Sequence, residues 1–329
     1  MGQEQGRGHR RGNEPGHDRG DRHPHEHGHG HGHTHGVGAG ADRRYLWAAL
    51  LLLLAFMLGE VVAAVVSGSL ALLSDAGHML SDVGAIAAAL WALHLAARPA
   101  QGKWTFGWKR AEIVSAAGNG ITLLVVSAII AVEAIRRLVS PPEVEGGIVL
   151  AVALVGVVVN IAAAWVLARA NRSSLNIEGA YQHILTDLYG FIGTVVAGVV
   201  ILVTGWTRAD PIASLVVVVL MLRAAHALLR DSGRVLLEAA PEDMDLSEVR
   251  RHLLEPEHVI DVHDLHVWTV TSGLPTLSCH VVLTDSCFRD GHAPALLDDL
   301  QACLHGHFDV EHSTFQLEPA EHAQHETGT

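Results

Sequence analysis

The stretch LALLSDAGHMLSDVGAIAAALWALH, residues 70–94, is largely apolar and long enough to cross a bilayer, which takes about 20 helical residues. Among its few ionisable residues, His78 and Asp82 lie four positions apart near the middle of the stretch. The segment AYQHILTDLYG repeats this pattern with His183 and Asp187, in the same order. In a helix, residues i and i+4 lie on one face, about 6 Å apart along the axis. Each pair is therefore expected to point toward one spot.

The apolar segments predict a membrane protein. Of the 329 residues, 49% are hydrophobic and the mean hydropathy is +0.28, with long Leu, Val and Ala runs between water-soluble ends. Six apolar segments each have about the length that a spanning helix needs. They cover residues 45–66, 70–94, 111–132, 147–168, 184–205 and 210–229. We therefore expect six transmembrane helices within a domain of residues 43–234.

Basic residues predict the orientation of the spans. If the six spans alternate in direction, ten lysines and arginines near their ends fall on one side and three on the other. The first group is Arg43, Arg44, Arg98, Lys103, Lys109, Arg110, Arg169, Arg172, Arg230 and Arg234, and the second is Arg136, Arg137 and Arg208. Because cytoplasmic loops are enriched in basic residues, we expect both termini to be cytoplasmic.

Both ends of the chain are expected to be disordered tails, residues 1–42 and 321–329. The N-terminal tail is rich in Gly and carries a histidine at every second position from His23 to His35, a composition that cannot bury a core. Such imidazoles can hold zinc loosely, so a delivery or buffering role competes here with a dispensable extension. Since no apolar stretch precedes residue 45, we expect no cleavable signal peptide.

After Pro241 the composition changes to that of a small soluble domain. MDLSEVRRHLLE and APALLDDLQACLH are typical of helices, while VIDVHDLHVWTV, PTLSCHVVLT and HSTFQLEP are typical of strands, the first two joined through Ser272 and Gly273. The predicted order is αββαβ, in a cytoplasmic metal-binding and dimerisation domain of residues 235–320. A unit of this size is marginal alone, so dimerisation or bound metal is expected to help it.

The paired motifs predict a metal site within the membrane. A carboxylate at bilayer depth costs at least about 2.5–3.5 kcal/mol, so two of them require a compensating partner. Two imidazole nitrogens and two carboxylate oxygens match tetrahedral zinc, whereas magnesium requires more oxygens and retained water. The set also favours zinc over manganese. The competing interpretation of one His-Asp pair is a hydrogen-bonded contact between helices, but the occurrence of two pairs favours a shared metal.

Three classes of function compete for these features. A transporter explains the intramembrane pairs, and a proton gradient can drive exchange because protons and zinc compete for the same ligands. A membrane-anchored zinc sensor or buffer leaves the pairs unexplained. An intramembrane metalloenzyme is disfavoured, because neither HMLSD nor HILTD contains the glutamate of an HExxH motif. The net charge of −13 provides no attraction for nucleic acid.

Five ordered motifs resemble those of the cation diffusion facilitator family, specifically its zinc-exporting bacterial branch. They are SGSLALLSDAGHMLSDVGAI, WTFGWKRAEIVSAAGNG, GAYQHILTDLYGFIG, DPIASLVVV and VHDLHVW with LSCHVVL, within about residues 45–318. The resemblance implies a homodimeric zinc/proton antiporter of the bacterial inner membrane, each protomer having six membrane helices and a cytoplasmic ferredoxin-like αββαβ domain. It also implies that the transport site consists of His78, Asp82, His183 and Asp187.

The same resemblance implies regulatory metal sites in the cytoplasmic domain. The matching positions are His263, His280, His312 and Glu318, and His292 is a further candidate. Zn²⁺ is then the substrate and also a structural or regulatory ion, and no catalytic cofactor is expected. Cadmium, cobalt, nickel or iron stay open as additional or alternative cargo, because ligand type ranks these metals without excluding any of them.

Overall fold

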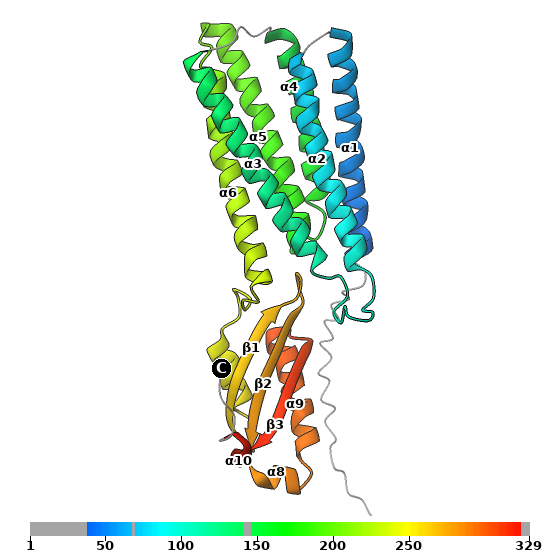
Figure 1. Ribbon diagram of the computed structural model, residues 1–329, viewed down its shortest axis with the longest axis vertical. Helices are drawn as coiled ribbons and strands as arrows, with labels where there is room; N and C mark the ends of the chain where they lie inside the picture. The colour runs from blue at the N-terminus through cyan, green and yellow to red at the C-terminus, as the bar shows by residue number, and fades with distance from the viewer. Residues whose placement is uncertain (1–37, 68–69, 141–145, 324–329) are drawn as a thin grey trace, which may run out of the picture. The chain divides into compact units, whose positions relative to one another are not determined.

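The computed structural model describes residues 38–67, 70–140 and 146–323 (Figure 1). Six long helices come first in the chain. They are α1 (Gly38–Ser67), α2 (Leu70–Ala96), α3 (Ala111–Val139), α4 (Gly146–Leu167), α5 (Leu175–Thr204) and α6 (Ala209–Leu236). Some side chains within these helices, including that of His78 in α2, lie outside the described part of the structure.

Five of these helices contain a described segment that is long and apolar enough to cross a membrane. The segments are Asp42–Val66, Ala111–Val139, Leu150–Leu167, Leu175–Thr204 and Ala209–Leu236. In α2 the described apolar part, Asp82–Ala96, is shorter. The helices expose many large apolar side chains, such as Leu51, Val155 and Val199, as a lipid-facing surface requires. The chain is therefore a membrane protein, while the count of six spans stays a prediction.

Helix α5 packs against the largest number of neighbours in the bundle, since it contacts α2, α3, α4 and α6. One hydrophobic cluster joins α1, α2, α4 and α5, and it includes Leu53, Ile86, Leu167 and Ile184. A second cluster joins α3 to α6. Because α5 touches both groups, residues on its inner face are shielded from lipid, and α2 lies directly against that face.

Two helices begin earlier than the apolar segments predicted. Helix α5 begins at Leu175 rather than near residue 184, because Ser174 caps it by accepting a hydrogen bond from the Ile177 backbone nitrogen (3.4 Å). Helix α1 begins at Gly38, inside the predicted N-terminal tail. Asp42 accepts a hydrogen bond from the backbone nitrogen of Asn171 (2.8 Å), which holds this first turn in place. The rest of that tail, residues 1–37, lies outside the described residues.

The C-terminal domain contains a mixed three-stranded sheet with helices on one face (Figure 1). Its elements are α7 (Leu246–Leu253), β1 (Val259–Thr269), β2 (Pro275–Leu283), α8 (Asp285–Arg289), α9 (Ala293–Phe308), β3 (His312–Pro319) and α10 (Ala320–Ala323). Strand β2 is central, antiparallel to β1 and parallel to β3. The main elements thus follow the expected αββαβ order. Helix α10 occupies the first residues of the predicted C-terminal tail, and residues 324–329 are not described.

Alternation along β2 determines where the core of this domain lies. Leu277, Cys279 and Val281 are buried against α7 and α9, whereas Ser278 and His280 point to the opposite face and are only partly buried. Each fully buried Leu or Val stabilises the domain by about 1.5–3 kcal/mol relative to exposure. The helices therefore cover the apolar face of the sheet, and the polar face is left for ligands.

Candidate metal sites

The first candidate site, the membrane cluster, joins α2 and α5. It consists of Asp82 from α2 with His183 and Asp187 from α5, whose potential ligand atoms all lie within 4.8 Å of one another. Nε2 of His183 is 2.6 Å from Oδ1 of Asp82. Three of the four residues predicted for the transport site are therefore side by side. The fourth, His78, lies in α2, but its side chain is outside the described residues.

Helix packing explains why these three side chains converge. His183 and Asp187 are one turn apart on α5 and so share a face. Asp82 reaches them because α2 packs against α5, where Asn176 also donates a hydrogen bond to the Ala89 carbonyl (2.9 Å). The apolar side chain of Ile184, next to His183, is fully buried in the cluster that joins the helices. Rigid helices thus hold the candidate ligands, with no loop involved.

The membrane cluster is a polar group in an apolar environment. His183 and Asp82 are almost completely buried, and Nδ1 of His183 has no hydrogen-bond partner among the described residues. Charged groups removed from water are costly unless they are paired, protonated or bound to a metal ion. The donor set of imidazole nitrogen and carboxylate oxygen is one that Zn²⁺ accepts. The arrangement can therefore bind a divalent cation or protons in its place.

The second candidate site, the sheet-face cluster, lies on the sheet face opposite the helices. It consists of His263 from β1, His280 from β2 and Glu318 from β3, again with ligand atoms within 4.8 Å. His263 and His280 are direct partners in the strand register. Nε2 of His263 is 2.6 Å from Oε1 of Glu318, and Nδ1 of His280 is 3.7 Å from Oε2. Each strand of the sheet therefore contributes one potential ligand.

A bulge in β1 sets the direction of the histidines in the HDLH segment. His263 pairs with His280 and His266 pairs with Ser278, so three steps along β1 match two steps along β2. The extra residue, Asp264, has a φ of +49°, in the left-handed region. As a result His263 and His266 point to the same face of the sheet, although strict alternation along the sequence would place them on opposite faces.

Glu318 is the most deeply buried member of the sheet-face cluster. Burial alone would raise the pKa of its carboxyl group, but hydrogen bonds from His263 and Gln316, with the charge of the neighbouring histidines, outweigh that effect. The pKa of Glu318 is therefore below its ordinary value. An ionised carboxylate between two imidazoles is a suitable ligand set for a zinc ion.

Two residues predicted for the cytoplasmic sites are placed elsewhere. His312 lies at the start of β3, six residues before Glu318 and therefore about 20 Å along the strand from it. His292 precedes α9, and its ring stacks on that of His258 at 5.4 Å. Within one chain, neither residue joins the three ligands of the sheet-face cluster. The register of β3, which is not determined by the sequence alone, separates His312 from Glu318, whereas His292 lies outside the sheet, immediately before α9.

Comparison with known proteins identifies the family. Residues 46–237 match the family described as "Cation efflux transmembrane domain", and residues 241–320 match "Cation efflux protein, cytoplasmic domain". The chain belongs to the cation diffusion facilitators. This cation diffusion facilitator exports metal cations across a membrane and is a transporter rather than an enzyme. The absence of an HExxH motif from the two His-Asp segments had predicted the same class.

Several relatives of this cation diffusion facilitator are similar over most of their length. The "Zinc transporter ZitB" of Escherichia coli is 43% identical over 80% of this chain and 83% of the relative. The "Metal cation efflux system protein CzcD" of Cupriavidus metallidurans is 40% identical over 86% and 90%. The "Cadmium, cobalt and zinc/H(+)-K(+) antiporter" of Bacillus velezensis is 38% identical over 86% and 90%.

Sequence reasoning missed two features of this cation diffusion facilitator. The first is Asp264, which hydrogen-bonds to Nε2 of His266 (2.9 Å) and lies 3.9 Å from Nε2 of His280. Its place between two histidines in HDLH was visible, but the bulge that turns it toward them was not. The second is a third group of potential ligands, His252, Cys303 and His307. Its members come from two helices that only the tertiary structure brings together.

Proposed function

We propose that this cation diffusion facilitator exports Zn²⁺ from the cytoplasm in exchange for external protons, through a site of His78, Asp82, His183 and Asp187. The observation that supports this most directly is the convergence of Asp82, His183 and Asp187 between α2 and α5, with a 2.6 Å contact from imidazole to carboxylate. These three side chains come from the two segments that carry the repeated His-Asp pair. His78, one turn from Asp82 on α2, completes a set of two imidazoles and two carboxylates.

The proposed exchange follows from the protonation chemistry of the ligands. Coordination requires neutral imidazole and ionised carboxylate, so zinc entering the site displaces protons and protons entering it displace zinc. A buried site that opens to one side at a time converts this competition into transport. The cytoplasmic side loads zinc where protons are scarce, and the external side releases it where they are abundant. No water is activated, because a closed four-ligand site has no open position.

Contacts at one end of the bundle support the proposed orientation. Near the start of α1, Arg43 donates a hydrogen bond to the carbonyl of Leu93, close to the end of α2 (2.9 Å), and Asp42 contacts Asn171 ahead of α5 (2.8 Å). These contacts gather segments that carry Arg43, Arg98, Arg169 and other basic residues. By the positive-inside rule this end faces the cytoplasm of a bacterial inner membrane, with six spans and both termini inside.

The sheet-face cluster is proposed to hold a resident zinc ion that regulates transport or stabilises the domain. His263, His280 and Glu318 supply three ligands, and the buried Glu318 carboxylate has one hydrogen-bond donor on each oxygen, His263 at Oε1 and Gln316 at Oε2. We also propose that two chains form a homodimer through the cytoplasmic domain. A domain of this size has a small core, so a partner chain adds buried area that it needs.

The cargo is proposed to be zinc first, with cadmium and cobalt as competitors. Of the relatives named above, one is described as a zinc transporter, one as an antiporter of cadmium, cobalt and zinc, and one as a metal cation efflux protein. Imidazole and carboxylate donors bind all three ions, so the site ranks them without strict selection.

The test is zinc movement into proteoliposomes that contain a zinc-sensitive dye, with an imposed proton gradient. The intact chain is compared with Asp187→Ala and with the matched control Asp210→Ala, which removes a carboxylate from α6 outside the membrane cluster. We expect gradient-dependent zinc movement in the intact chain and in the control, and none in Asp187→Ala.

Two other results would change the proposal in different ways. If zinc moves in the intact chain without dependence on the proton gradient, the efflux site stands and the exchange is wrong. If neither the intact chain nor the control moves zinc while both bind it, the membrane-anchored sensor or buffer replaces the transporter.

A further inference from the structure

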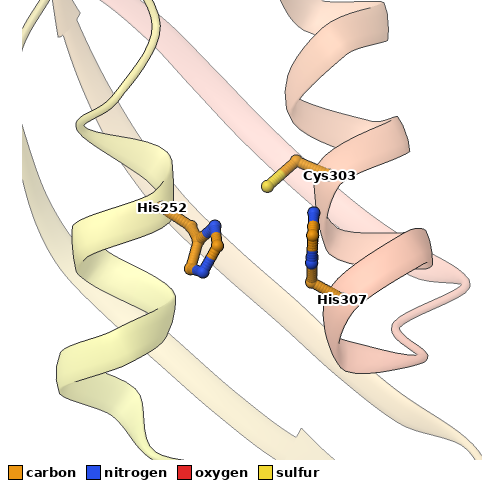
Figure 2. A group of neighbouring side chains, drawn as sticks. All are labelled: His252, Cys303 and His307. Atoms are coloured by element: carbon orange, nitrogen blue, oxygen red, sulfur yellow. The ribbon is translucent and has the colours of Figure 1, made fainter.

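A third group of potential ligands lies on the helical side of the C-terminal domain. Figure 2 shows His252 of α7 facing Cys303 and His307 of α9, and the ligand atoms of the three residues lie within 4.8 Å of one another. The two imidazole rings are 4.8 Å apart and tilted by 31°. This helix-face cluster is separated from the sheet-face cluster by the hydrophobic core, because α7 and α9 cover the other side of the sheet.

The positions of the three residues are fixed by the packing of the two helices. Cys303 and His307 are one turn apart on α9, so their side chains share a face. Leu253, next to His252, and Leu304, next to Cys303, are fully buried in the core that joins α7 to α9. The backbone beneath the cluster is therefore well anchored, although the cluster itself lies at the edge of the core where an ion can reach it.

The donor set suits a cation with affinity for sulfur. Zinc binds imidazole nitrogen at about 2.0–2.1 Å and thiolate sulfur at about 2.3 Å, so tetrahedral ligands lie about 3.3–3.6 Å apart. Rotation of the exposed His307 side chain can bring the present separations, at most 4.8 Å, into that range. Thiolate with imidazole selects zinc and softer ions over magnesium, calcium or manganese.

Charged side chains of both signs lie beside the helix-face cluster, and the nearest is Arg251, whose Nη2 is 3.1 Å from Nε2 of His252. Oε2 of Glu255 is 3.8 Å from Nδ1 of His252, and Oε1 of Glu248 is 4.0 Å from its Nε2. A carboxylate such as that of Glu255, or a water molecule, can therefore complete a tetrahedral set. Both carboxylates also pair with Arg251, at 3.4 Å for Glu248 and 2.7 Å for Glu255. The exposed Arg251 side chain must move away from His252 when an ion enters.

Cys303 differs from the two other cysteines of the chain. Cys279 and Cys287 are buried in the core, and burial raises the pKa of Cys279 to about 12, so it stays protonated and inert. Cys303 is only partly buried and lies beside two imidazoles. Burial and the charge of Glu255 raise the pKa of its thiol as well, so ion binding displaces a proton there.

We propose that His252, Cys303 and His307 form a second cytoplasmic metal site, which takes a thiophilic divalent cation such as Zn²⁺ or Cd²⁺. One ion bridges α7 and α9 and so ties the first helix of the domain to its longest one. This site is independent of the proposed transport site and of the sheet-face cluster. The competing explanation is simple packing, in which His252 contacts the rings of His307 and Phe308 and the neighbouring charged side chains without binding an ion.

The test uses Co²⁺ as a spectroscopic probe of the full-length chain in detergent. Cobalt bound to a thiolate gives a sulfur-to-metal charge-transfer absorption that imidazole and carboxylate do not produce. All three cysteines lie in the C-terminal domain and the His-rich N-terminal segment has none, so that segment cannot produce this signal. We expect a thiolate band whose intensity at saturation corresponds to one Co²⁺–thiolate bond per chain, because the other sites bind Co²⁺ without contributing to this band.

Variants separate the possible sources of the band. Cys303→Ala is expected to abolish it, whereas the matched control Cys287→Ala and the double variant His263→Ala/His280→Ala are expected to keep it. His307→Ala replaces an exposed residue and leaves the core intact, so it serves if Cys303→Ala does not fold. The substitution His307→Ala should weaken Co²⁺ binding by at least about tenfold. Even the loss of a residue that only hydrogen-bonds to a metal ligand lowers metal affinity by about 10–100-fold. Absence of the band in the intact chain, or its persistence in Cys303→Ala, overturns the proposal.

Discussion

The membrane cluster and the sheet-face cluster use the same two kinds of ligand in different surroundings. In the membrane cluster the side chains of His183 and Asp82 are 4% and 11% exposed. In the sheet-face cluster His263 and His280 are 30% and 21% exposed, and only Glu318, at 2%, is fully buried. Ligand chemistry is thus nearly constant between the two regions, while access to water is not.

This difference determines what each cluster does without a metal ion. The buried groups of the membrane cluster lack water to stabilise their charge, so they must hold either a cation or protons. Glu318 instead has hydrogen bonds from His263 and Gln316, and water reaches the two histidines. The first arrangement favours exchange between cation and protons, and the second favours slow retention or sensing of one ion.

The largest expected effect is the loss of zinc transport when a carboxylate is removed from the membrane cluster, compared with the same change in the sheet-face cluster. Asp82→Asn keeps the shape of the side chain but loses its charge, so we expect zinc transport to fall to the level of protein-free liposomes. Glu318→Gln is the matched change in the sheet-face cluster and should leave transport measurable. The measurement is the initial rate of zinc movement in proteoliposomes. Equal losses in both variants would contradict the proposed division between cargo site and resident site.

A change of ligand type should alter cargo selection only in the membrane cluster. His183→Asp replaces a borderline nitrogen ligand with a hard oxygen ligand, so we expect the ratio of manganese to zinc transport to rise. The control is His263→Asp, for which that ratio should stay unchanged. Transport of the two ions is compared in competition, and a shift in selectivity in the control would show that the sheet-face cluster filters the cargo.

A smaller effect is expected on metal-dependent stability. An ion present at 100 times its dissociation constant stabilises the folded state by about 2.7 kcal/mol. In the double variant His263→Ala/His280→Ala, zinc should raise the midpoint of unfolding of the C-terminal domain by less than in the intact chain, and the remaining rise is the contribution of the helix-face cluster. Since Cys279 and Cys287 are buried in the core of that domain, labelling of these two thiols in the full-length chain follows its unfolding. His312→Ala, outside the cluster, should respond to zinc as the intact chain does, and loss of the response there would place a ligand at His312.

The smallest expected effect concerns acid stability of the metal-free protein. Because the pKa of Glu318 is lower in the folded chain, its ionised form stabilises the fold above the unfolded value of about 4.3. That stabilisation is lost as the pH falls through the lower folded value. The intact chain should therefore be more stable than Glu318→Gln above about pH 5, with a difference that shrinks below about pH 4. A pyridyl disulfide that reacts in acid can report the unfolding, and a constant difference down to about pH 3 would contradict the assignment.

Patterns with a short repeat were predictable from the sequence. The i, i+4 spacing placed His183 and Asp187 on one face of a helix, and the period-two pattern predicted the strands of the C-terminal domain. The turn through Ser272 and Gly273 is confirmed, and Gly273 has the positive φ of +73° that such a turn uses. Local steric rules are sufficient for each of these features.

Features that depend on tertiary contacts were not predictable. The bulge at Asp264 turns the side chain of His266 to the opposite face of the sheet. No residue in the sequence marks this bulge, because Asp tolerates the left-handed conformation but is also common elsewhere. His252 meets Cys303 only because α7 packs on α9, and the spacing of 51 residues between them carries no signal. The early start of α5 at Leu175 depends on a single serine cap outside the apolar segment.

Neighbouring residues of β2 belong to opposite faces of the sheet, since Cys279 lies in the core and His280 in the sheet-face cluster. Deleting one residue from this strand exchanges the faces of every position beyond the deletion. Among naturally occurring gene variants, a substitution at His280 therefore removes one ligand, whereas a single-codon deletion nearby removes the ligand cluster and the core together. We therefore expect the length of β2 to be conserved more strictly than the identity of any one ligand, so that divergence between relatives proceeds there by substitution.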